Sequence, residues 1–306
     1  MQIIRNLSKA NLALPNLVIT IGNFDGVHLG HQKIISEVKR IAKEKNLSSA
    51  ILTFEPHPIS FFKPDKSDNF RISSLAQKLQ IFQEIGVDYL VILPFNKKLS
   101  EISASDFTKE ILVKSLNMKQ LIIGHDFTFG KSRQGNFHFL EQQSKFLGFG
   151  LTEIKAIGNY EQSYSSTLIR NFICDGKISE ANKVLGRNFA ISGIIQEGRK
   201  LASQLGFPTA NLSIKNRIIK PKFGVYKSST FIPHLNQKFS SITNFGVKPT
   251  LDGNSSPLFE THIINFSGKI YGKKIIVELL DFIREEKKFA SLQDLTSQIA
   301  RDIKNL

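Results

Sequence analysis

The segment Gly22–His31, with the sequence GNFDGVHLGH, joins two stretches of different pattern. Before it, Leu17–Ile21 is a continuous apolar and β-branched run of the kind that forms a buried strand. After it, His31–Asn46 has apolar residues at the spacing of one helix face. A strand, a glycine-rich turn and an amphipathic helix in this order predict an α/β unit. The residues of the helix face are Ile34, Ile35, Val38, Ile41 and Ala42.

The same segment has the composition of a phosphate-binding loop. A helix N-terminus presents backbone N–H groups and the positive end of the helix dipole, and Gly22, Gly26 and Gly30 let a ligand approach the backbone. His28 and His31 add two donors, which can stabilise the charge that an α-phosphate gains as pyrophosphate leaves. Two other interpretations stay open: the histidines form a metal-ligand pair, or they belong to a turn packed into the core.

Further apolar runs continue the pattern through the first half of the chain. They are separated by segments of helical periodicity, which predicts a parallel sheet covered by helices. Ligands of such sheets bind at the carboxyl ends of the strands, and Gly22–His31 follows one of these ends. The additional predicted strands are Ser49–Phe54, Val87–Leu93, Leu121–Ile123 and Thr152–Ile157.

From about Phe189 the chain changes to short strands punctuated by Gly, Pro and Asn, which predicts a small antiparallel barrel. Gly186 follows the helical pattern Glu180–Leu185 and marks a helix end, so we predict two domains, 1–186 and 187–306. The predicted barrel strands are Ile191–Ile195, Ser241–Asn244, Thr261–Ile264 and Lys274–Leu280.

A helix is predicted to close the chain. Ser291 and Asp294 have the spacing of a capping box at its start. The apolar residues that follow recur on one face and are expected to form a buried stripe. They are Leu292, Leu295, Ile299 and Ile303.

Composition limits the class of protein. The chain has 306 residues, of which 41% are hydrophobic and 22% charged, which suits two globular cores. Cys174 is the only cysteine, so an intrachain disulfide and a thiolate zinc cage are excluded and a reducing compartment is favoured. No stretch approaches the length of a membrane span, and the N-terminal region lacks the pattern of a signal peptide. We therefore expect a cytoplasmic protein that is not embedded in a membrane.

The charge balance favours anionic partners. Lysine and arginine total 41 against 26 acidic residues, giving a net charge of +15. Nucleotides and nucleic acids both satisfy this preference. The basic residues are scattered, without a basic run or a zinc-finger spacing, so we predict nucleotide binding and no nucleic acid.

Three more motifs of the first half, together with the first one, resemble those of a known family. Thr53–Pro58 reads TFEPHP, Gly124–Gly130 reads GHDFTFG and Ser165–Arg170 reads SSTLIR. With GNFDGVHLGH, and in this order, they resemble the bifunctional riboflavin kinase and FAD synthetase family of bacteria. The resemblance implies a nucleotidyltransferase-type, Rossmann-like domain that converts FMN and ATP to FAD. It implies ATP contacts at Gly22, Asn23, Phe24, His28, His31, Ser166, Thr167 and Arg170, with Asp126 and Phe127 near the nucleotide and flavin.

These assignments have structural alternatives. Hydroxyls and an arginine fork suit phosphate oxygens, but Thr167 could instead cap the helix that follows it. Phe127 and Phe129 suit a planar ring, but both could be core residues. Leu168 occupies a position where the family commonly has a basic residue, so a phosphate contact is absent there.

The second half resembles the riboflavin kinase domain of the same family. Its motifs are GFPTAN at Gly206–Asn211, GVY at Gly224–Tyr226, NFGVKPT at Asn244–Thr250 and ETH at Glu260–His262. The resemblance implies that Thr209 and Asn211 hold Mg²⁺ and ATP. It also implies that Glu260 accepts the proton of the riboflavin 5′-hydroxyl as that hydroxyl attacks the γ-phosphate. Such a base and an oxygen-bound Mg²⁺ are the parts that in-line phosphoryl transfer requires.

Two alternatives to the kinase interpretation remain. Pro208 and Asn211 could make only a turn, with Glu260 on a solvated strand face. The family usually has Gly and Arg where Ala202 and Ser203 stand, which would affect a flap over the phosphates. The chain is therefore expected to make FMN and FAD; the alternative is an FAD synthetase with a degenerate flavin-binding module. A third hypothesis is a nucleic-acid-binding protein on the same scaffold.

Overall fold

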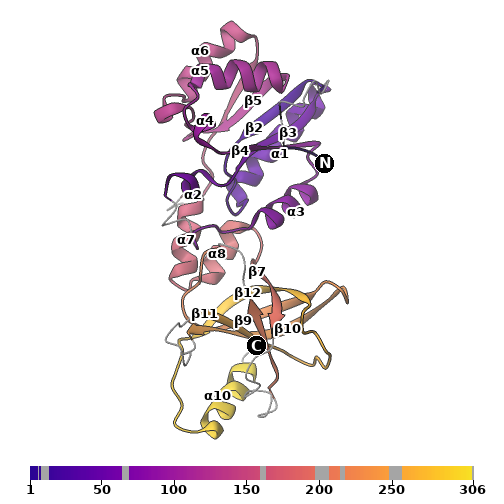
Figure 1. Ribbon diagram of the computed structural model, residues 1–306, viewed down its shortest axis with the longest axis vertical. Helices are drawn as coiled ribbons and strands as arrows, with labels where there is room; N and C mark the ends of the chain where they lie inside the picture. Colours follow the sequence, from indigo (N-terminus) through magenta and orange to yellow (C-terminus); the bar gives the residue numbers. More distant parts are fainter. Residues whose placement is uncertain are drawn as a thin grey trace. The chain divides into compact units, whose positions relative to one another are not determined.

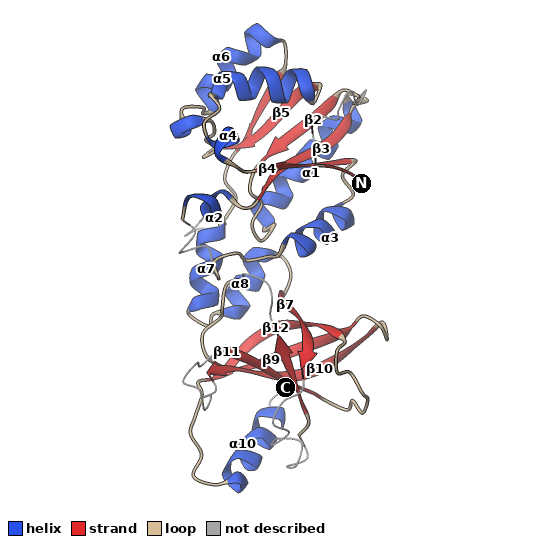
Figure 2. Ribbon diagram, in the orientation of Figure 1, coloured by secondary structure: helices blue, strands red, loops and turns tan. Residues whose placement is uncertain are grey.

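A parallel sheet forms the centre of the first unit, Met1–Ser166 (Figures 1 and 2). The computed structural model describes residues 1–5, 7, 14–63, 69–158, 163–196, 207–213, 218–247 and 257–304. Within them the strand order is β1-β4-β3-β2-β5-β6, and every pairing is parallel. The strands are β1 (Gln2–Ile4), β2 (Leu17–Ile21), β3 (Ser48–Glu55), β4 (Tyr89–Pro94), β5 (Met118–Gly124) and β6 (Gly150–Ile154).

Helices cover both faces of this sheet, which explains why all of β2 is buried. Leu17 and Ile19 point to one face and pack with Phe107 and Leu140 from the helical segments that follow β4 and β5. Val18 points to the other face and packs with Val38 of α1. The helical segments are α1 (Leu29–Glu44), α2 (Pro58–Phe62), α3 (Leu75–Ile85), α4 (Lys97–Ser100), α5 (Ala104–Asp106), the π-helical η2 (Phe107–Ser115), η3 (Lys131–Arg133) and α6 (Phe137–Leu147).

The strand order places two motifs next to each other. From β2 the sheet continues through β3 and β4 on one side and through β5 and β6 on the other, so β2 and β5 flank the point where the order reverses. The segment Gly22–His31 follows β2, and GHDFTFG begins at the last residue of β5. Because ligands of open parallel sheets bind in the crevice at such a point, the fold places both motifs where a ligand is expected.

A closed antiparallel barrel forms the second unit, Thr167–Leu306. Its strand order is β10-β11-β8-β7-β12-β9, and β9 pairs with β10 to close it. The predicted fold classes, a parallel α/β domain and a small barrel with a closing helix, are confirmed. The strands are β7 (Phe189–Gln196), β8 (Thr209–Ser213), β9 (Gly224–Ile232), β10 (Gln237–Val247), β11 (Pro257–Ile263) and β12 (Lys274–Arg284).

Three strands were not predicted from the sequence: β1, β8 and β9. The last of these contains Ser228 and Thr230, whose hydroxyls lie inside the barrel and bond to Ser241 at 2.8 Å. Ser228 also bonds to Thr243 at 2.8 Å. A polar barrel interior removes the alternation of apolar and polar residues that identifies a strand from sequence.

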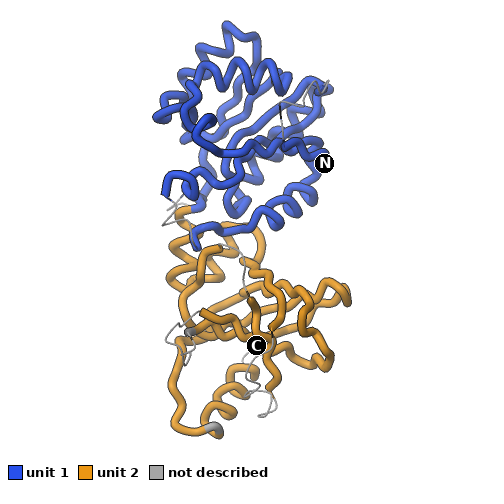
Figure 3. The backbone as a smooth tube through the Cα atoms, in the orientation of Figure 1, with its two compact units in different colours: residues 1–166 blue, residues 167–306 orange. Residues whose placement is uncertain are grey.

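Two helices precede the barrel, α7 (Ser166–Cys174) and α8 (Ile178–Leu185). The α8 helix ends at Gly186, whose φ of 69° is the left-handed conformation predicted for a helix C-cap. It packs on β12 and β7, and α8 and all of α7 after Ser166 belong to the same compact unit as the barrel, as the colours of Figure 3 show.

The closing helix, α10 (Leu292–Lys304), has the predicted capping interaction, since Asp294 N donates to Ser291 Oγ at 3.1 Å. The predicted buried stripe is wrong in one respect. Leu295, Ile299 and Ile303 are only half-buried, because a cavity separates this face of the helix from the barrel. The side chain of Leu292 lies outside the described part. In the described residues no helix is long and apolar enough to cross a bilayer.

Candidate active sites

The two histidines of the first motif lie at the start of α1. His28 is the N-cap residue, and His31 is in the first turn. Their rings are stacked, with centroids 3.6 Å apart and planes inclined by 25°. The ring of Phe24 meets that of His31 edge-on at 5.1 Å. At Gly30 a Cβ atom would lie 3.0 Å from the His28 ring, so the absence of a side chain there lets the imidazole lie over the helix end.

The loop before α1 is held in an unusual backbone conformation. Phe24, Gly26 and Val27 have positive φ angles of 48°, 79° and 40°. The conformation strains the two residues with side chains, so surrounding contacts must support it. Three such contacts come from side chains. The buried Asp25 carboxylate accepts from Ile72 N at 3.0 Å, Gly26 N donates to Ser73 Oγ at 3.1 Å, and Ser166 Oγ donates to Asp25 O at 2.8 Å.

A metal ion bound by His28 and His31 would need further ligands nearby. Within the described ranges, no group of three or more His, Cys, Asp or Glu side chains is placed to hold a metal ion. A zinc site needs four ligands when structural and three when catalytic.

The residues after β5 form the second part of this site. Asp126 is exposed, and Phe127 is half-buried. Phe127 stacks on Phe129 with centroids 5.4 Å apart and planes inclined by 17°, and both pack against the core. Phe127 is therefore a core-anchored ring with one part open to solvent.

The SSTLIR segment forms the start of α7. Ser166 is its first residue, so Thr167 lies inside the first turn and does not cap the helix. Thr167 is exposed and Arg170 is half-buried. Ser166 belongs to the first unit and bonds to the Asp25 carbonyl, whereas Thr167 and Arg170 belong to the second.

A phenylalanine cluster that sequence reasoning missed lies at the carboxyl ends of β3 and β4. Phe61 and Phe62 of α2 both meet the ring of Phe95, at 5.5 Å and 5.6 Å, and Phe54 meets it at 5.9 Å. Phe62 is 62% exposed, which is unusual for such a large apolar side chain. The adjacent phenylalanines just after TFEPHP were the available signal.

The barrel brings the predicted kinase residues together. Glu260 of β11 pairs with Asn211 of β8, and His262 pairs with Thr209. Directly paired residues point to the same side of a sheet, so these four side chains share one face. The alternative in which Asn211 only makes a turn is wrong, because Asn211 lies within β8.

Asn211 also has a buried oxygen to satisfy. Its side chain is 7% exposed, and Oδ1 has no hydrogen-bond partner among the described residues. A buried acceptor without a donor is rare, and a cation that prefers oxygen ligands would satisfy it. The donor set of Asn211 and Thr209 therefore fits Mg²⁺.

A cavity of about 260 Å³ lies beside Glu260. Its apolar wall includes Phe289 and the half-buried Leu295 and Ile299 of α10. The helix is joined to the barrel by Arg284 and Asp302, with Nη2 and Oδ2 2.7 Å apart. The ion pair therefore lies in the lining of the cavity, which combines apolar and polar groups. Its polar lining includes Thr209, Asn244, Glu260, His262, Arg284, Glu286 and Lys287.

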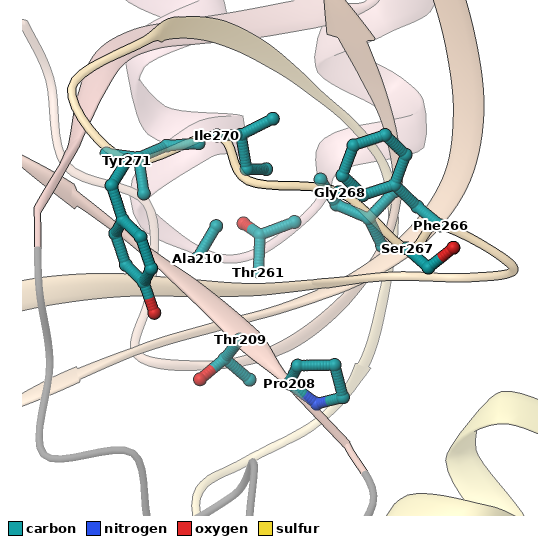
Figure 4. Close-up of a pocket in the computed structure, with 11 residues that line it drawn as sticks. Pro208, Thr209, Ala210, Thr261, Phe266, Ser267, Gly268, Ile270 and Tyr271 are labelled. Atoms are coloured by element: carbon teal, nitrogen blue, oxygen red, sulfur yellow. The ribbon is translucent and has the colours of Figure 1, made fainter.

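A second cavity, of about 250 Å³, lies on the other side of Thr209 (Figure 4). Tyr271 and the segment Phe266–Gly268 frame it, and Ala210 and Thr261 lie behind. Thr209 lines both cavities. The residue thus lies between two spaces, each large enough to hold part of a substrate.

Two family models match the chain, one in each half. Residues 11–168 match the model described as FAD synthetase, and residues 185–306 match the one described as riboflavin kinase. A curated protein of Buchnera aphidicola subsp. Schizaphis graminum is 39% identical, over 98% of this chain and 95% of its own. It is named bifunctional riboflavin kinase/FMN adenylyltransferase. The chain belongs to this family.

Other members of the bifunctional riboflavin kinase/FMN adenylyltransferase family match over similar lengths. The Haemophilus influenzae protein is 38% identical over 99% of this chain and 97% of its own. The Escherichia coli K12 protein is 37% identical over 98% and 94%. Both halves of the chain are thus covered by relatives that carry the name of both enzymes.

A solved structure agrees with the family fold but has a different name. The protein from Streptococcus pneumoniae superposes with a TM-score of 0.90, is 28% identical and covers 99% of this chain and 98% of its own. It is described as a macrolide-efflux protein. Since the two family models and the curated relatives agree with each other, membership of the bifunctional enzyme family rests on them.

Proposed function

We propose that this protein phosphorylates riboflavin to FMN and then adenylylates FMN to FAD, with ATP as the co-substrate of both reactions. The observation that carries the proposal is the presence of one family match in each half, FAD synthetase in the first and riboflavin kinase in the second. We assign adenylylation to residues 1–186 and phosphorylation to residues 187–306. A cytoplasmic location follows from both substrates and from the single cysteine.

In adenylylation, the FMN phosphate attacks the α-phosphate of ATP and pyrophosphate leaves. His28 and His31 at the N-terminus of α1 stabilise the charge that develops on the α-phosphate, together with the helix dipole. We assign ATP contacts to Gly22, Asn23, Phe24, Ser166, Thr167 and Arg170. The support for this set is chemical: backbone amides, hydroxyls and a guanidinium all suit phosphate oxygens.

The flavin of this first reaction needs a flat apolar surface. Asp126 and Phe127, which follow β5, are our assignment from sequence. The phenylalanine cluster at the carboxyl ends of β3 and β4 adds a second such surface at the same sheet edge, with Phe62 as its most exposed ring. Offset stacking on phenylalanine suits an isoalloxazine ring.

In phosphorylation, Glu260 is the base that takes the proton of the riboflavin 5′-hydroxyl. We assign the cavity beside Glu260 to riboflavin, because the hydroxyl must reach the base and Phe289, Leu295 and Ile299 offer an apolar wall to the ring system. The other cavity is then left for the nucleotide. Thr209, which lines both, lies where the γ-phosphate must pass from one substrate to the other.

Mg²⁺ is the metal that we assign to the kinase site. Thr209 and Asn211 would hold it, and the buried Oδ1 of Asn211, which has no partner in the described part of the chain, supports this choice. When bound, Mg²⁺ neutralises phosphate charge as the transferred group leaves ATP. The pairing of β11 with β8 fixes the position of Glu260 relative to Thr209 and Asn211.

The alternative of an FAD synthetase with a degenerate second module rests on Ala202 and Ser203, which lie outside the described residues. Family membership over the full length supports two activities. The nucleic-acid hypothesis predicts binding to RNA or DNA that weakens with salt and that ATP and FMN fail to displace.

The deciding experiment is a product time course. Purified protein is incubated with riboflavin, Mg²⁺ and ATP, and FMN and FAD are resolved by chromatography. Transient FMN followed by FAD supports both activities. A parallel reaction started from FMN tests adenylylation alone, so FAD from FMN but no product from riboflavin would restrict the function to FAD synthesis.

A further inference from the structure

A lysine is buried beneath the loop that carries the histidines. Lys78 is in the second turn of α3 and is only 3% exposed. Its ammonium donates to the carbonyl oxygen of Asn23, with Nζ and O 3.1 Å apart. Thr53 Oγ1 lies 3.4 Å from the same oxygen. The carbonyl that precedes the strained residue Phe24 therefore accepts a hydrogen bond from a charged donor on the α3 side of the loop.

Packing alone does not explain a lysine at this position. On α3, Lys78 shares the buried face with Phe82, where an apolar residue would be the stabilising choice. Burial lowers the pKa of the Lys78 ammonium, and Asp25 and Glu55 only partly oppose this effect. Arg71, which is paired with Glu55 at 2.9 Å, also acts to lower the pKa. Retaining a charge in these surroundings costs stability.

The peptide group links this lysine to the phosphate site. In a trans peptide the C=O and the following N–H point in opposite directions. Fixing the Asn23 carbonyl towards Lys78 therefore directs the Phe24 N–H away from α3, to the other side of the loop. The buried ammonium also adds a positive potential that solvent screens weakly.

We propose that Lys78 is a positioning residue for adenylyl transfer: it holds the Asn23–Phe24 peptide so that the loop and the histidine pair meet the phosphates of ATP in the reactive geometry. The inference rests on the proposed FAD synthetase activity. Lys78 itself touches no substrate. Its effect reaches the reaction through the backbone of Asn23 and Phe24.

The test uses the full-length protein, with FMN and ATP as substrates. Lys78→Met keeps the length of the side chain and removes the charge and the donor. We expect kcat for FAD formation to fall about 10- to 100-fold, the effect typical of a misplaced reacting group, while the KM for FMN changes little. The matched control is Lys43→Met, an exposed lysine at the last turn of α1, which should leave kcat unchanged. Riboflavin phosphorylation in the same protein should also be unchanged.

Stability separates positioning from a merely structural role. Because the pKa of Lys78 is lower in the folded protein, the unfolded chain binds this proton more tightly. The charge therefore disfavours folding fully below the folded-state pKa, and this effect is lost as the pH rises to the pKa of the unfolded chain. Lys78→Met should therefore unfold at the same temperature as the wild type or higher while reacting more slowly. In Lys78→Ala, propylamine should restore a saturable part of the rate, since its ammonium fits the space vacated by the side chain.

Three results would overturn the proposal. The first is a Lys78→Met enzyme with wild-type kcat. The second is a Lys78→Met enzyme whose lower kcat is fully explained by a smaller folded fraction at the assay temperature. The third is a failure of propylamine to raise the rate of Lys78→Ala. Hydrogen exchange of the amides in 23–31 tests positioning without the reaction and should quicken in Lys78→Met. If the wild type makes no FAD, the proposed function fails, and unchanged exchange would then reject the role of Lys78 separately.

Discussion

Glu260 lies directly opposite Asn211 across the pairing of β11 with β8, and Asn211 keeps a buried Oδ1 without a hydrogen-bond partner among the described residues. The relationship places a carboxylate beside an unused oxygen ligand on one face of the barrel. A base and a metal ligand must be neighbours in phosphoryl transfer, because the attacked phosphate contacts both. Two predictions for the kinase site follow from this pair.

Glu260→Gln tests the base. The change keeps the size and shape of the side chain but removes its basicity, so riboflavin phosphorylation should fall about 100- to 10,000-fold. Conversion of FMN to FAD should continue at the wild-type rate, because it is assigned to residues 1–186, which do not include Glu260. The measurement is the initial rate of each reaction in the same preparation. Equal phosphorylation rates in the variant and the wild type would make Glu260 a structural strand residue.

Asn211→Leu tests the metal ligand. Leucine has the branched shape of asparagine but offers no oxygen, so phosphorylation should require a higher Mg²⁺ concentration and its maximal rate should fall. Stability should change little, since relief of the unsatisfied buried oxygen, about 1–3 kcal/mol, offsets a similar cost of fitting the larger leucine side chain. Rates are measured over a Mg²⁺ titration, beside a thermal unfolding curve. An unchanged Mg²⁺ dependence would contradict the ligand assignment.

His28→Ala and His31→Ala test the stacked pair of the first unit. Each should lower kcat for FAD formation by about 100- to 1,000-fold, the usual effect of losing one donor to a developing charge. FMN binding should change much less, because both rings are assigned to the transition state. Steady-state kinetics together with FMN titration provide the comparison. A loss of FMN affinity with normal turnover would instead make the histidines binding groups. The two losses should not add, since rings 3.6 Å apart act as one unit.

Sequence patterns predicted the elements whose burial is apolar and regular. The strand Leu17–Ile21 and the helix face of Ile35, Val38 and Ile41 are buried as expected, since both faces of the sheet are covered. The strand Gly224–Ile232 was missed because serine and threonine hydroxyls bond to one another inside the barrel.

The site residues divide in the same way. Motif residues such as His28 and Glu260 could be found from sequence because their chemistry is visible in the chain. Lys78 could not, because a lysine on a helix is normally solvated and its burial depends on a loop 55 residues away. The half-exposure of Leu295 and Ile299 was equally hidden, because the cavity that they line has no sequence pattern of its own.

The last prediction concerns the segment between the two activities. Residues 1–186 alone should convert FMN and ATP to FAD, because every motif assigned to adenylylation lies before Gly186. That fragment ends with α8, however, and α8 packs on the barrel strands β12 and β7. Its side chains Ile178, Ala181, Val184 and Leu185 are buried there. The fragment should therefore be active but prone to association through this exposed apolar face.

Two fragments of the second half test the contact between α8 and the barrel. Asn182 joins α8 to the barrel, since its Nδ2 donates to Leu279 O at 2.9 Å and its Oδ1 accepts from Phe189 N at 2.7 Å. Residues 167–306 should thus unfold at a clearly higher temperature than residues 187–306, because burying each large apolar side chain contributes about 1.5–3 kcal/mol. In 167–306, Asn182→Ala should remove part of that difference. Equal melting temperatures for the two fragments would show that α8 adds nothing to the barrel. A well-folded 1–186 fragment that forms no FAD would contradict the assignment of adenylylation to this half.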